Sequence, residues 1–299
     1  MTVPPPLFDT ALARRRLIRA RRAGYADFLL ARAVDDLDDR LGAILRRFTV
    51  AVDLATPNAM VAERLRLSDR AETVLRLASA PETSGGLLAI GDPEALPLAP
   101  ARFDLAVSLL ALHAVNDLPG TLVQLRRCLK PDGLFLGCFL GGCSLIELRQ
   151  AFGEAESEVE GGISPRVAPF ADLRDVGGLL QRAGFALPVT DTDLVTVRYP
   201  DPFALMRDLR AMGMTNVLTE RRRTPLRRAT LMRAAALYAE RFSDPDGRVR
   251  ASFELVWVSG WAPHESQQVP LKPGSAGARL ADALGTTEHV PFLDSKREP

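Results

Sequence analysis

Stretches of hydrophobic residues with a strand-like pattern alternate along the chain with stretches of helical spacing, and this alternation predicts an α/β fold. Short apolar runs such as Phe103–Leu109 and Leu134–Leu140 are typical of strands that are buried on both faces of a parallel sheet. Between these runs, leucines recur at helical spacing after Pro119, a residue type favoured in the first turn of a helix. The central stretch therefore predicts a strand, a helix and a second strand.

The same two patterns extend over most of the chain and predict one α/β domain. We predict its strands at residues 48–54, 73–78, 86–90, 103–109, 134–140, 189–199 and 249–261. The last of these runs alternates, and we expect it to be the antiparallel edge strand. We therefore divide the chain into an N-terminal helical segment (1–47), an α/β domain (48–262) and a loop-like tail that we expect to be partly disordered (263–299).

Composition and charge narrow the function classes. Of the 299 residues, 47% are hydrophobic and 25% are charged, and the net charge of +1 points to no polyanionic partner. Two arginine clusters, at residues 14–22 and 221–228, lack interleaved aromatic side chains, so we expect no nucleic-acid partner. No apolar run approaches the roughly 20 residues that span a bilayer, and three cysteines without CxxC spacing fit a reducing compartment. We expect a cytoplasmic protein without a transmembrane segment.

One long stretch carries a family resemblance. Residues 103–139 read FDLAVSLLALHAVNDLPGTLVQLRRCLKPDGLFLGCF. This stretch resembles the fourth and fifth strands of class I S-adenosylmethionine-dependent methyltransferases, and it is most similar to two related groups. One group is the malonyl-carrier-protein O-methyltransferases of biotin synthesis, and the closer one is the respiratory complex I assembly factors that hydroxylate an arginine. Further marks of the second group lie at residues 141–149, 158–165 and 260–267.

The resemblance implies a Rossmann-like class I methyltransferase fold. In this fold a seven-stranded, mostly parallel sheet has an antiparallel edge strand, and helices are added before the first strand and around the last three. It also implies that the N-terminal helices lie over a cleft that binds S-adenosylmethionine. The residues that it places beside this cofactor are Asp53, Ala55, Asp92, Leu109 and Leu110. For Asp92, an Asx turn before Pro93 is an alternative interpretation.

The chain departs from the family pattern where the cofactor would be held most tightly. The loop after the first strand usually contains glycines, because the cofactor approaches the backbone too closely for a Cβ atom. The second strand usually ends in an acid that holds the ribose hydroxyls, and loss of this acid raises a dissociation constant about tenfold to several-hundredfold. The residues found at these positions are Ala55, Pro57, Ala59 and Ala78.

The candidate catalytic and substrate residues each have a structural alternative. His113 follows a buried strand, and it is either a packed histidine that lines the cleft or a general base. Glu147, Glu158 and Glu160 belong to an acidic run that is commonly a solvated helix face. Because the resemblance implies a substrate that carries an arginine, these glutamates are also candidates for guanidinium contacts. The spacing of histidines and cysteines predicts no metal site.

The sequence is consistent with three functions. The chain is an assembly factor that modifies an arginine of a protein subunit, with respiratory complex I as the implied partner. Alternatively, it is a methyltransferase that acts on a carboxyl or another small nucleophile and only aligns the acceptor with S-adenosylmethionine. The third hypothesis is a scaffold that keeps the fold and has lost the cofactor.

Overall fold

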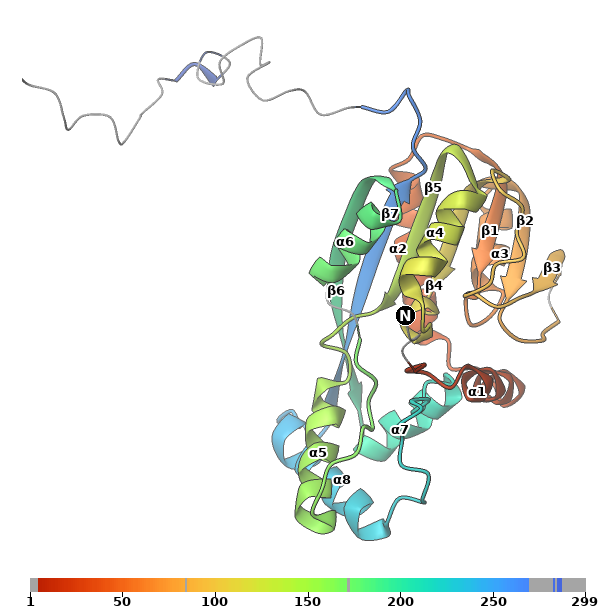
Figure 1. Cartoon of the computed structure of the whole chain (residues 1–299). Helices are drawn as coiled ribbons and strands as arrows, with labels where there is room; N and C mark the ends of the chain where they lie inside the picture. The colour runs from red at the N-terminus through yellow and green to blue at the C-terminus, as the bar shows by residue number, and fades with distance from the viewer. Residues whose placement is uncertain (1–4, 84, 171–172, 269–281, 283, 287–299) are drawn as a thin grey trace, which may run out of the picture. The chain divides into compact units, whose positions relative to one another are not determined.

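A computed structural model describes residues 5–83, 85–170, 173–268, 282 and 284–286 (Figure 1). The chain divides into two compact units, residues 1–264 and 265–299, and the first unit contains the sheet. The seven strands are β1 (Phe48–Leu54), β2 (Ala71–Ala78), β3 (Leu87–Ile90), β4 (Phe103–Leu109), β5 (Leu129–Leu140), β6 (Ala186–Tyr199) and β7 (Val249–Trp261).

The strand order is β3-β2-β1-β4-β5-β7-β6. The first five strands pair in parallel, whereas β7 pairs antiparallel with both β5 and β6. This arrangement confirms the predicted fold of a mostly parallel seven-stranded sheet. The chain order reverses between β1 and β4, and ligands of open α/β sheets bind outside the carboxyl ends of strands at such a reversal.

One strand assignment was wrong. We predicted residues 249–261 as the edge strand, but β7 lies inside the sheet and β6 occupies the edge. The burial of the two strands explains the difference. The middle of β7, residues 255–258, is buried at every position, whereas β6 alternates between exposed and half-buried residues for most of its length. An interior strand of a covered sheet is buried on both faces, and alternation is typical of a strand with one solvated face.

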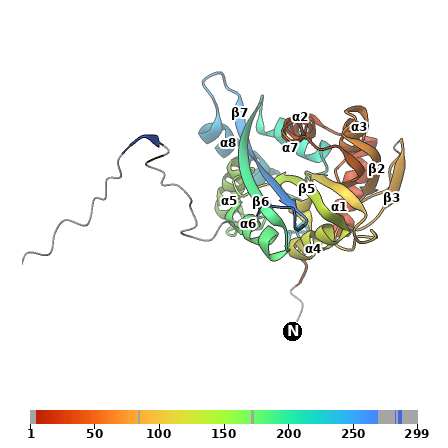
Figure 2. The same cartoon turned by 90° about the horizontal axis from the view of Figure 1, so that it is seen from above.

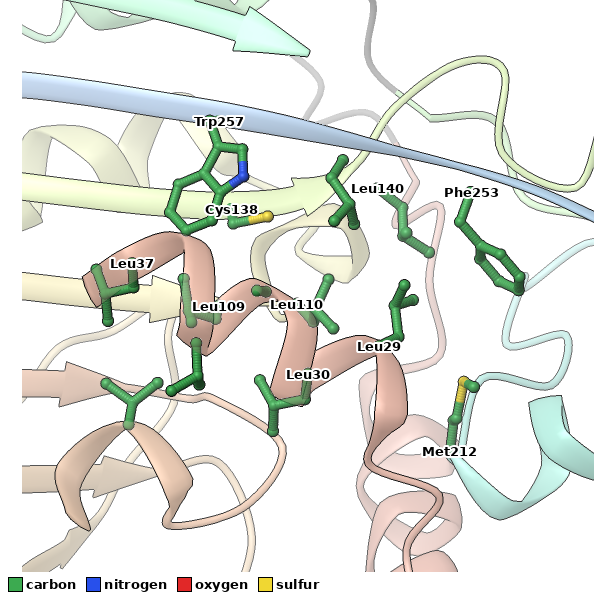
Figure 3. Close-up of a cluster of buried hydrophobic side chains, with 14 of the residues drawn as sticks. Leu29, Leu30, Leu37, Leu109, Leu110, Cys138, Leu140, Met212, Phe253 and Trp257 are labelled. Carbon is green, nitrogen blue, oxygen red and sulfur yellow. The ribbon is translucent and has the colours of Figure 1, made fainter. Parts of the chain in front are cut away.

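Helices cover both faces of the sheet (Figures 1 and 2). One buried cluster joins β1, β4, β5 and β7 to α2 (Phe28–Gly42) and α3 (Met60–Leu67). Figure 3 shows part of it, with Leu37 of α2 on the side of Trp257 and Leu29 of α2 facing Leu140 of β5. A second cluster joins the opposite face to α4 (Leu118–Cys128) and α6 (Leu173–Arg182). Burial on both faces explains why the central strands are almost continuously apolar.

The remaining helices gather beyond the carboxyl ends of the parallel strands (Figure 1). They are α1 (Thr10–Arg22), α5 (Ile146–Glu160), α7 (Pro202–Ala211), α8 (Arg228–Phe242) and the short 3-10 helix η1 (Leu112–Ala114). In the described residues, no helix is both long enough and apolar enough to cross a bilayer.

Candidate functional site

A cavity of about 590 Å³ lies beyond the carboxyl ends of β1 and β4. Ala55 and Leu110, the residues that directly follow these two strands, form part of its wall. Residues of α1 and α7 and the segment 212–217 enclose it from the other sides. Its volume falls within the roughly 300–1,000 Å³ of small-molecule sites, and its position at the strand-order reversal is the usual one for a nucleotide.

Three residues of the cavity wall have a strained backbone. Ala55, Leu110 and Leu145 have φ angles of 55°, 51° and 55°, in the left-handed region that non-glycine residues rarely adopt. They follow β1, β4 and β5 respectively, and all three line the cavity. Such strain costs about 1–3 kcal/mol per residue and clusters at functional sites. At Ala55 the chain therefore adopts a backbone conformation that glycine reaches without this strain.

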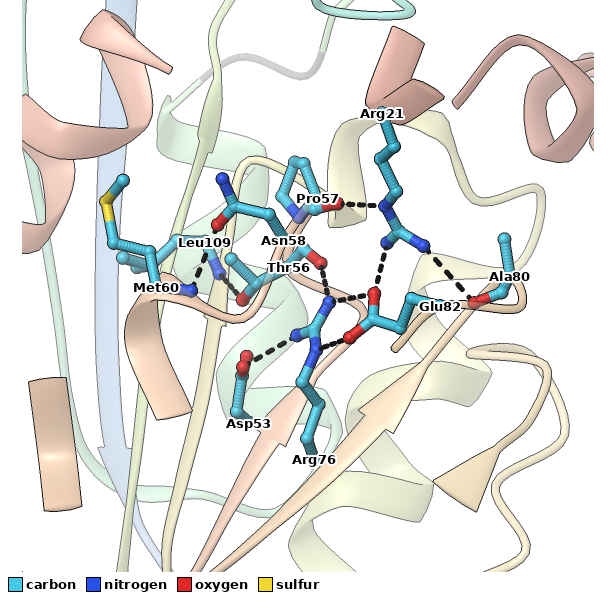
Figure 4. A network of polar contacts seen from close by, with 10 residues as sticks. All are labelled: Arg21, Asp53, Thr56, Pro57, Asn58, Met60, Arg76, Ala80, Glu82 and Leu109. Carbon is cyan, nitrogen blue, oxygen red and sulfur yellow. Dashed lines mark hydrogen bonds and ion pairs between the residues drawn. The ribbon is translucent and has the colours of Figure 1, made fainter. Parts of the chain in front are cut away.

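A buried ion-pair network stands beside the cavity (Figure 4). Arg76 of β2 is fully buried; it donates to Asp53 at 2.7 Å and to the carbonyl oxygen of Thr56 at 2.8 Å, and it also pairs with Glu82. Burial opposes the guanidinium charge, but the hydrogen bonds from Arg76 to Glu82 and Asp53 raise the pKa of Arg76. The side chain therefore remains protonated. Asp53 and Glu82, the carboxylates near the ends of β1 and β2, are therefore both paired within the network.

The same network holds α1 in place. Arg21 donates from Nε to the carbonyl oxygen of Pro57 at 2.6 Å and from Nη1 to that of Ala80 at 3.2 Å, and it pairs with Glu82 at 2.8 Å (Figure 4). At the start of the helix, the backbone N–H of Phe8 donates to the side chain of Asn116 at 2.7 Å. These contacts hold α1 at the wall of the cavity.

The structure brings three of the five predicted cofactor residues to the cavity. Ala55, Asp92 and Leu110 line it, whereas Asp53 and Leu109 are completely buried and do not. Asp92 accepts a hydrogen bond from the backbone N–H of Glu94 at 2.9 Å, which is the Asx turn considered as the alternative. Its second oxygen lies 4.0 Å from Arg14 and remains at the cavity wall.

The cavity residues fit S-adenosylmethionine with a weakened ribose contact. Ser79 is the residue at the end of β2 that lines the cavity, and a hydroxyl there replaces the charged acceptor of the family pattern. Pro57 also lines the cavity and has no backbone donor. Asp92 would accept from the adenine amine, Ser79 would contact the ribose, and Leu110 would pack on the apolar parts of the ligand.

His113 lies in the cavity wall, next to Phe170, with ring centroids 5.9 Å apart. Its Nδ1 atom is buried and has no hydrogen-bond partner among the described residues. Burial lowers the pKa of His113 to about 4, so the imidazole is neutral near pH 7. A neutral imidazole can accept a proton, but a pKa near 4 makes it a weak general base. Its catalytic role remains a prediction.

The three candidate substrate glutamates do not line the cavity. Glu147 is buried and accepts hydrogen bonds from the backbone and side chain of Ser252. Glu158 pairs with Arg233, and Glu160 pairs with Arg222 and accepts from Thr230 at 2.6 Å. These three side chains of α5 therefore stabilise its packing against α8 and β7. The carboxylates at the cavity wall are those of Asp92 and Glu94, a residue that the sequence reading did not consider for the site.

Sequence reasoning also missed Arg76 and Arg21. A charged residue in the middle of the apolar run 73–78 was a usable signal, because an arginine buried in a strand requires a carboxylate partner. The partner Glu82 lies six residues later, beyond the end of the strand. Within the described residues, no group of three or more histidine, cysteine, aspartate or glutamate side chains could hold a metal ion.

Comparison with known proteins agrees with this arrangement. Residues 49–137 match the family described as "Methyltransferase domain". The chain is 40% identical over 281 residues to the human protein named "Arginine-hydroxylase NDUFAF5, mitochondrial", covering 90% of this chain and 81% of that protein. It is 34% identical over 288 residues to the malonyl-[acyl-carrier protein] O-methyltransferase of Xylella fastidiosa, covering 89% and 95%. The chain belongs to this methyltransferase family.

Membership in the family confirms the resemblance seen in the sequence. The zebrafish (Danio rerio) arginine hydroxylase of the same name is 37% identical over 287 residues, covering 92% of this chain and 89% of that protein. Among solved structures, the YcgJ protein of Bacillus subtilis matches with a TM-score of 0.52 at 13% identity, over 76% of this chain and 98% of that one. At this identity the structural match shows the fold alone. The methyltransferase domain includes β1 and β4, whose ends carry the cavity.

Proposed function

We propose that the cavity binds S-adenosylmethionine and that the chain modifies an arginine side chain of a protein subunit, with a subunit of respiratory complex I as the partner. The observation that carries this proposal is the 40% identity, over 90% of the chain, to a protein named as an arginine hydroxylase. The cavity at the strand-order reversal supports it, because it provides a pocket of suitable size beside the methyltransferase domain.

The residues of the cavity have distinct tasks in this proposal. Ala55, Asp92 and Leu110 would hold the cofactor, which supplies an activated methyl group in the methyltransferases of this fold. Glu94 is the second carboxylate of the wall, and it accepts from the backbone N–H of Asn116 at 2.7 Å. Its position makes it the candidate that would receive the guanidinium of a substrate. The protein contributes alignment of the two groups and exclusion of water.

Gene deletion and complementation test the substrate. Mass spectrometry of complex I subunits should show loss of one arginine modification in the deleted strain and its return with the parent gene. A Glu94→Gln gene should restore the modification only in part, because the charged acceptor is lost. As a matched control, Glu63→Gln changes an exposed carboxylate on α3 that does not line the cavity. Unchanged arginine masses in the deleted strain would contradict the proposal.

A methyltransferase that acts on a carboxyl group is the second candidate, and the charge of the cavity wall favours it. The cavity wall contains two carboxylates and four arginines. The arginines are Arg14, Arg16, Arg166 and Arg210. Arg166 is paired with Glu156, whereas the exposed side chain of Arg210 makes no hydrogen bond or ion pair with the described residues. A substrate carboxylate could therefore pair with Arg210.

Methyl transfer from labelled S-adenosylmethionine to a malonyl carrier protein separates the two candidates. If the acceptor is a carboxylate, Arg210→Gln should lower kcat/KM about tenfold, the effect of losing one charge-assisted hydrogen bond. If the acceptor is an arginine, no label reaches the carrier protein and the same variant leaves arginine modification unchanged.

We also propose a cytosolic location, which the cysteines support. Cys128 and Cys138 are buried free thiols. Free thiols fit a reducing compartment. The human and zebrafish relatives carry the word "mitochondrial" in their names, so fractionation of cells that produce the chain is the direct test.

A further inference from the structure

The helix that covers the cavity has two faces with different arginine environments. On the inner side, Arg21 pairs with Glu82 and Arg16 donates to the carbonyl oxygen of Asn216. On the outer side, Arg15, Arg19 and Arg22 are exposed and make no hydrogen bond or ion pair through their side chains with the described residues. We call these three residues the α1 arginine stripe.

The stripe is regular and has no neutralising acid on its own helix. Its residues stand at positions i, i+4 and i+7, so they lie on one face over about 10 Å. The helix, Thr10–Arg22, contains six arginines and no aspartate or glutamate. Asp9, the acid directly before it, caps the helix through the backbone N–H of Leu12 and pairs with Arg221.

Local stability does not explain the stripe. Like charges at i,i+3 and i,i+4 destabilise a helix. The helix dipole favours cations in the last turn and so accounts for Arg19 and Arg22, but Arg15 lies in the middle of the helix. Elsewhere on the surface some arginines have acidic partners, as Arg233 has in Glu158 and Arg241 has in Glu154, whereas single exposed arginines such as Arg102 have none among the described residues. The stripe differs from these single arginines because three unpaired guanidinium groups share one face of a helix that carries no acid.

The neighbouring residues indicate the class of ligand. A shallow groove is lined by the stripe together with Ile18 and Ala23. Ile18 gives one apolar contact, which is too little for insertion into a membrane surface. No aromatic side chain lines the groove for stacking of bases, as nucleic-acid sites generally have. An acidic α-helix, with carboxylates at the same i, i+4 and i+7 spacing, matches both the charge and the length of the stripe.

We propose that the α1 arginine stripe docks an acidic helix of a partner protein on the outer side of the helix that lines the cavity. The opposite side of α1 lines the cavity with Ala13 and Leu17, so a docked partner lies within about one helix diameter, roughly 10 Å, of the cavity wall. That the docked protein is the substrate rests on the proposed function, whereas the docking itself does not. Electrostatic docking of this kind raises the association rate and selects the partner.

Fluorescence anisotropy with a synthetic helical peptide tests the docking. The peptide carries glutamates at i, i+4 and i+7, and a lysine peptide of the same spacing serves as the charge control. The full chain should bind the glutamate peptide and not the lysine peptide, and the affinity should fall as salt is added. The triple variant Arg15→Glu, Arg19→Glu, Arg22→Glu should weaken binding by about tenfold or more, and the triple glutamine variant by less.

A second triple variant provides the matched control. Arg102→Glu, Arg127→Glu, Arg182→Glu changes the net charge equally, at exposed arginines without side-chain partners among the described residues. This variant should bind the glutamate peptide within about twofold of the parent. Equal losses in the two triple variants, or no binding by the parent, would overturn the proposal. Tighter binding of single-stranded RNA or of phosphatidylserine vesicles than of the glutamate peptide would also overturn it.

Titration with S-adenosylmethionine separates this proposal from the proposed function. The stripe variant should bind the cofactor as the parent does, because its three residues do not line the cavity. If the parent does not bind the cofactor but the stripe effect on the peptide persists, the docking surface stands and the enzymatic proposal fails.

Discussion

At the scale of single residues, Ala55 shows that the loop after β1 can adopt a left-handed backbone conformation without a glycine. The sequence predicted that Ala55 and Pro57 would weaken cofactor binding, since both replace expected glycines. In the structure Ala55 adopts the left-handed conformation that glycine favours, and it lines the cavity. The backbone path could not be predicted from the alanine itself, because alanine disfavours this conformation.

Restoring the glycines should strengthen cofactor binding. The double variant Ala55→Gly, Pro57→Gly removes a Cβ from the cavity wall, relieves the strain at residue 55 and returns a backbone donor at residue 57. We expect the affinity for S-adenosylmethionine to rise about tenfold, which corresponds to about 1.4 kcal/mol. Isothermal titration calorimetry measures it. An unchanged affinity would mean that another part of the cavity limits binding.

His113 should make stability depend on pH in a defined window. Burial lowers the pKa of His113 to about 4 in the folded chain, from 6.5 in the unfolded chain. Below about pH 6.5 the unfolded state therefore binds a proton that the folded state does not, and stability falls by up to about 1.4 kcal/mol per pH unit down to about pH 4. Urea unfolding from pH 7 to 4.5 should show a smaller loss for His113→Phe than for the parent. Equal losses would contradict the assigned burial.

At the scale of elements, the sequence did not predict the ion pairs that connect β2 to α1 through Glu82. The run 73–78 correctly predicted a strand, but the pattern could not show that Arg76 is buried or that Glu82 turns back to it. The same limit applies to α5. Its acidic residues were predicted either as a solvated face or as substrate contacts, and tertiary packing placed three of them against α8 and β7 instead. Pairing between distant elements leaves no periodic signal.

Removing Arg76 from this ion-pair network should strongly destabilise the folded chain. Arg76→Ala leaves Asp53 buried without its 2.7 Å partner and leaves Glu82 with Arg21 as its remaining cationic partner. Loss of one member of a buried ion pair typically costs about 3–5 kcal/mol. We expect a decrease of this size in the free energy of unfolding, measured by denaturant titration. The exposed, unpaired Arg102→Ala should change it by less than about 0.5 kcal/mol, and a similarly small effect of Arg76→Ala would refute the role of the network.

At the scale of the whole molecule, periodicity and joined motifs were sufficient for the fold. Buried parallel strands give continuous apolar runs, so all seven strands could be located along the chain, and only the order of the last two in the sheet was misjudged. The cavity was predicted on its sheet side, through Ala55, Asp92 and Leu110. Its other wall could not be predicted, because it depends on how α7 and the segment 212–217 pack beneath α1.

The central claim is that this cavity holds S-adenosylmethionine, and calorimetric titration tests it most directly. Ala111→Trp fills the cavity from a residue of its wall, and Val189→Trp adds the same side chain at an exposed position of β6. We predict saturable binding by the parent and by Val189→Trp, and a loss of at least about tenfold in affinity for Ala111→Trp. No saturable heat from the parent up to millimolar cofactor, or equal affinity for all three proteins, would contradict the account.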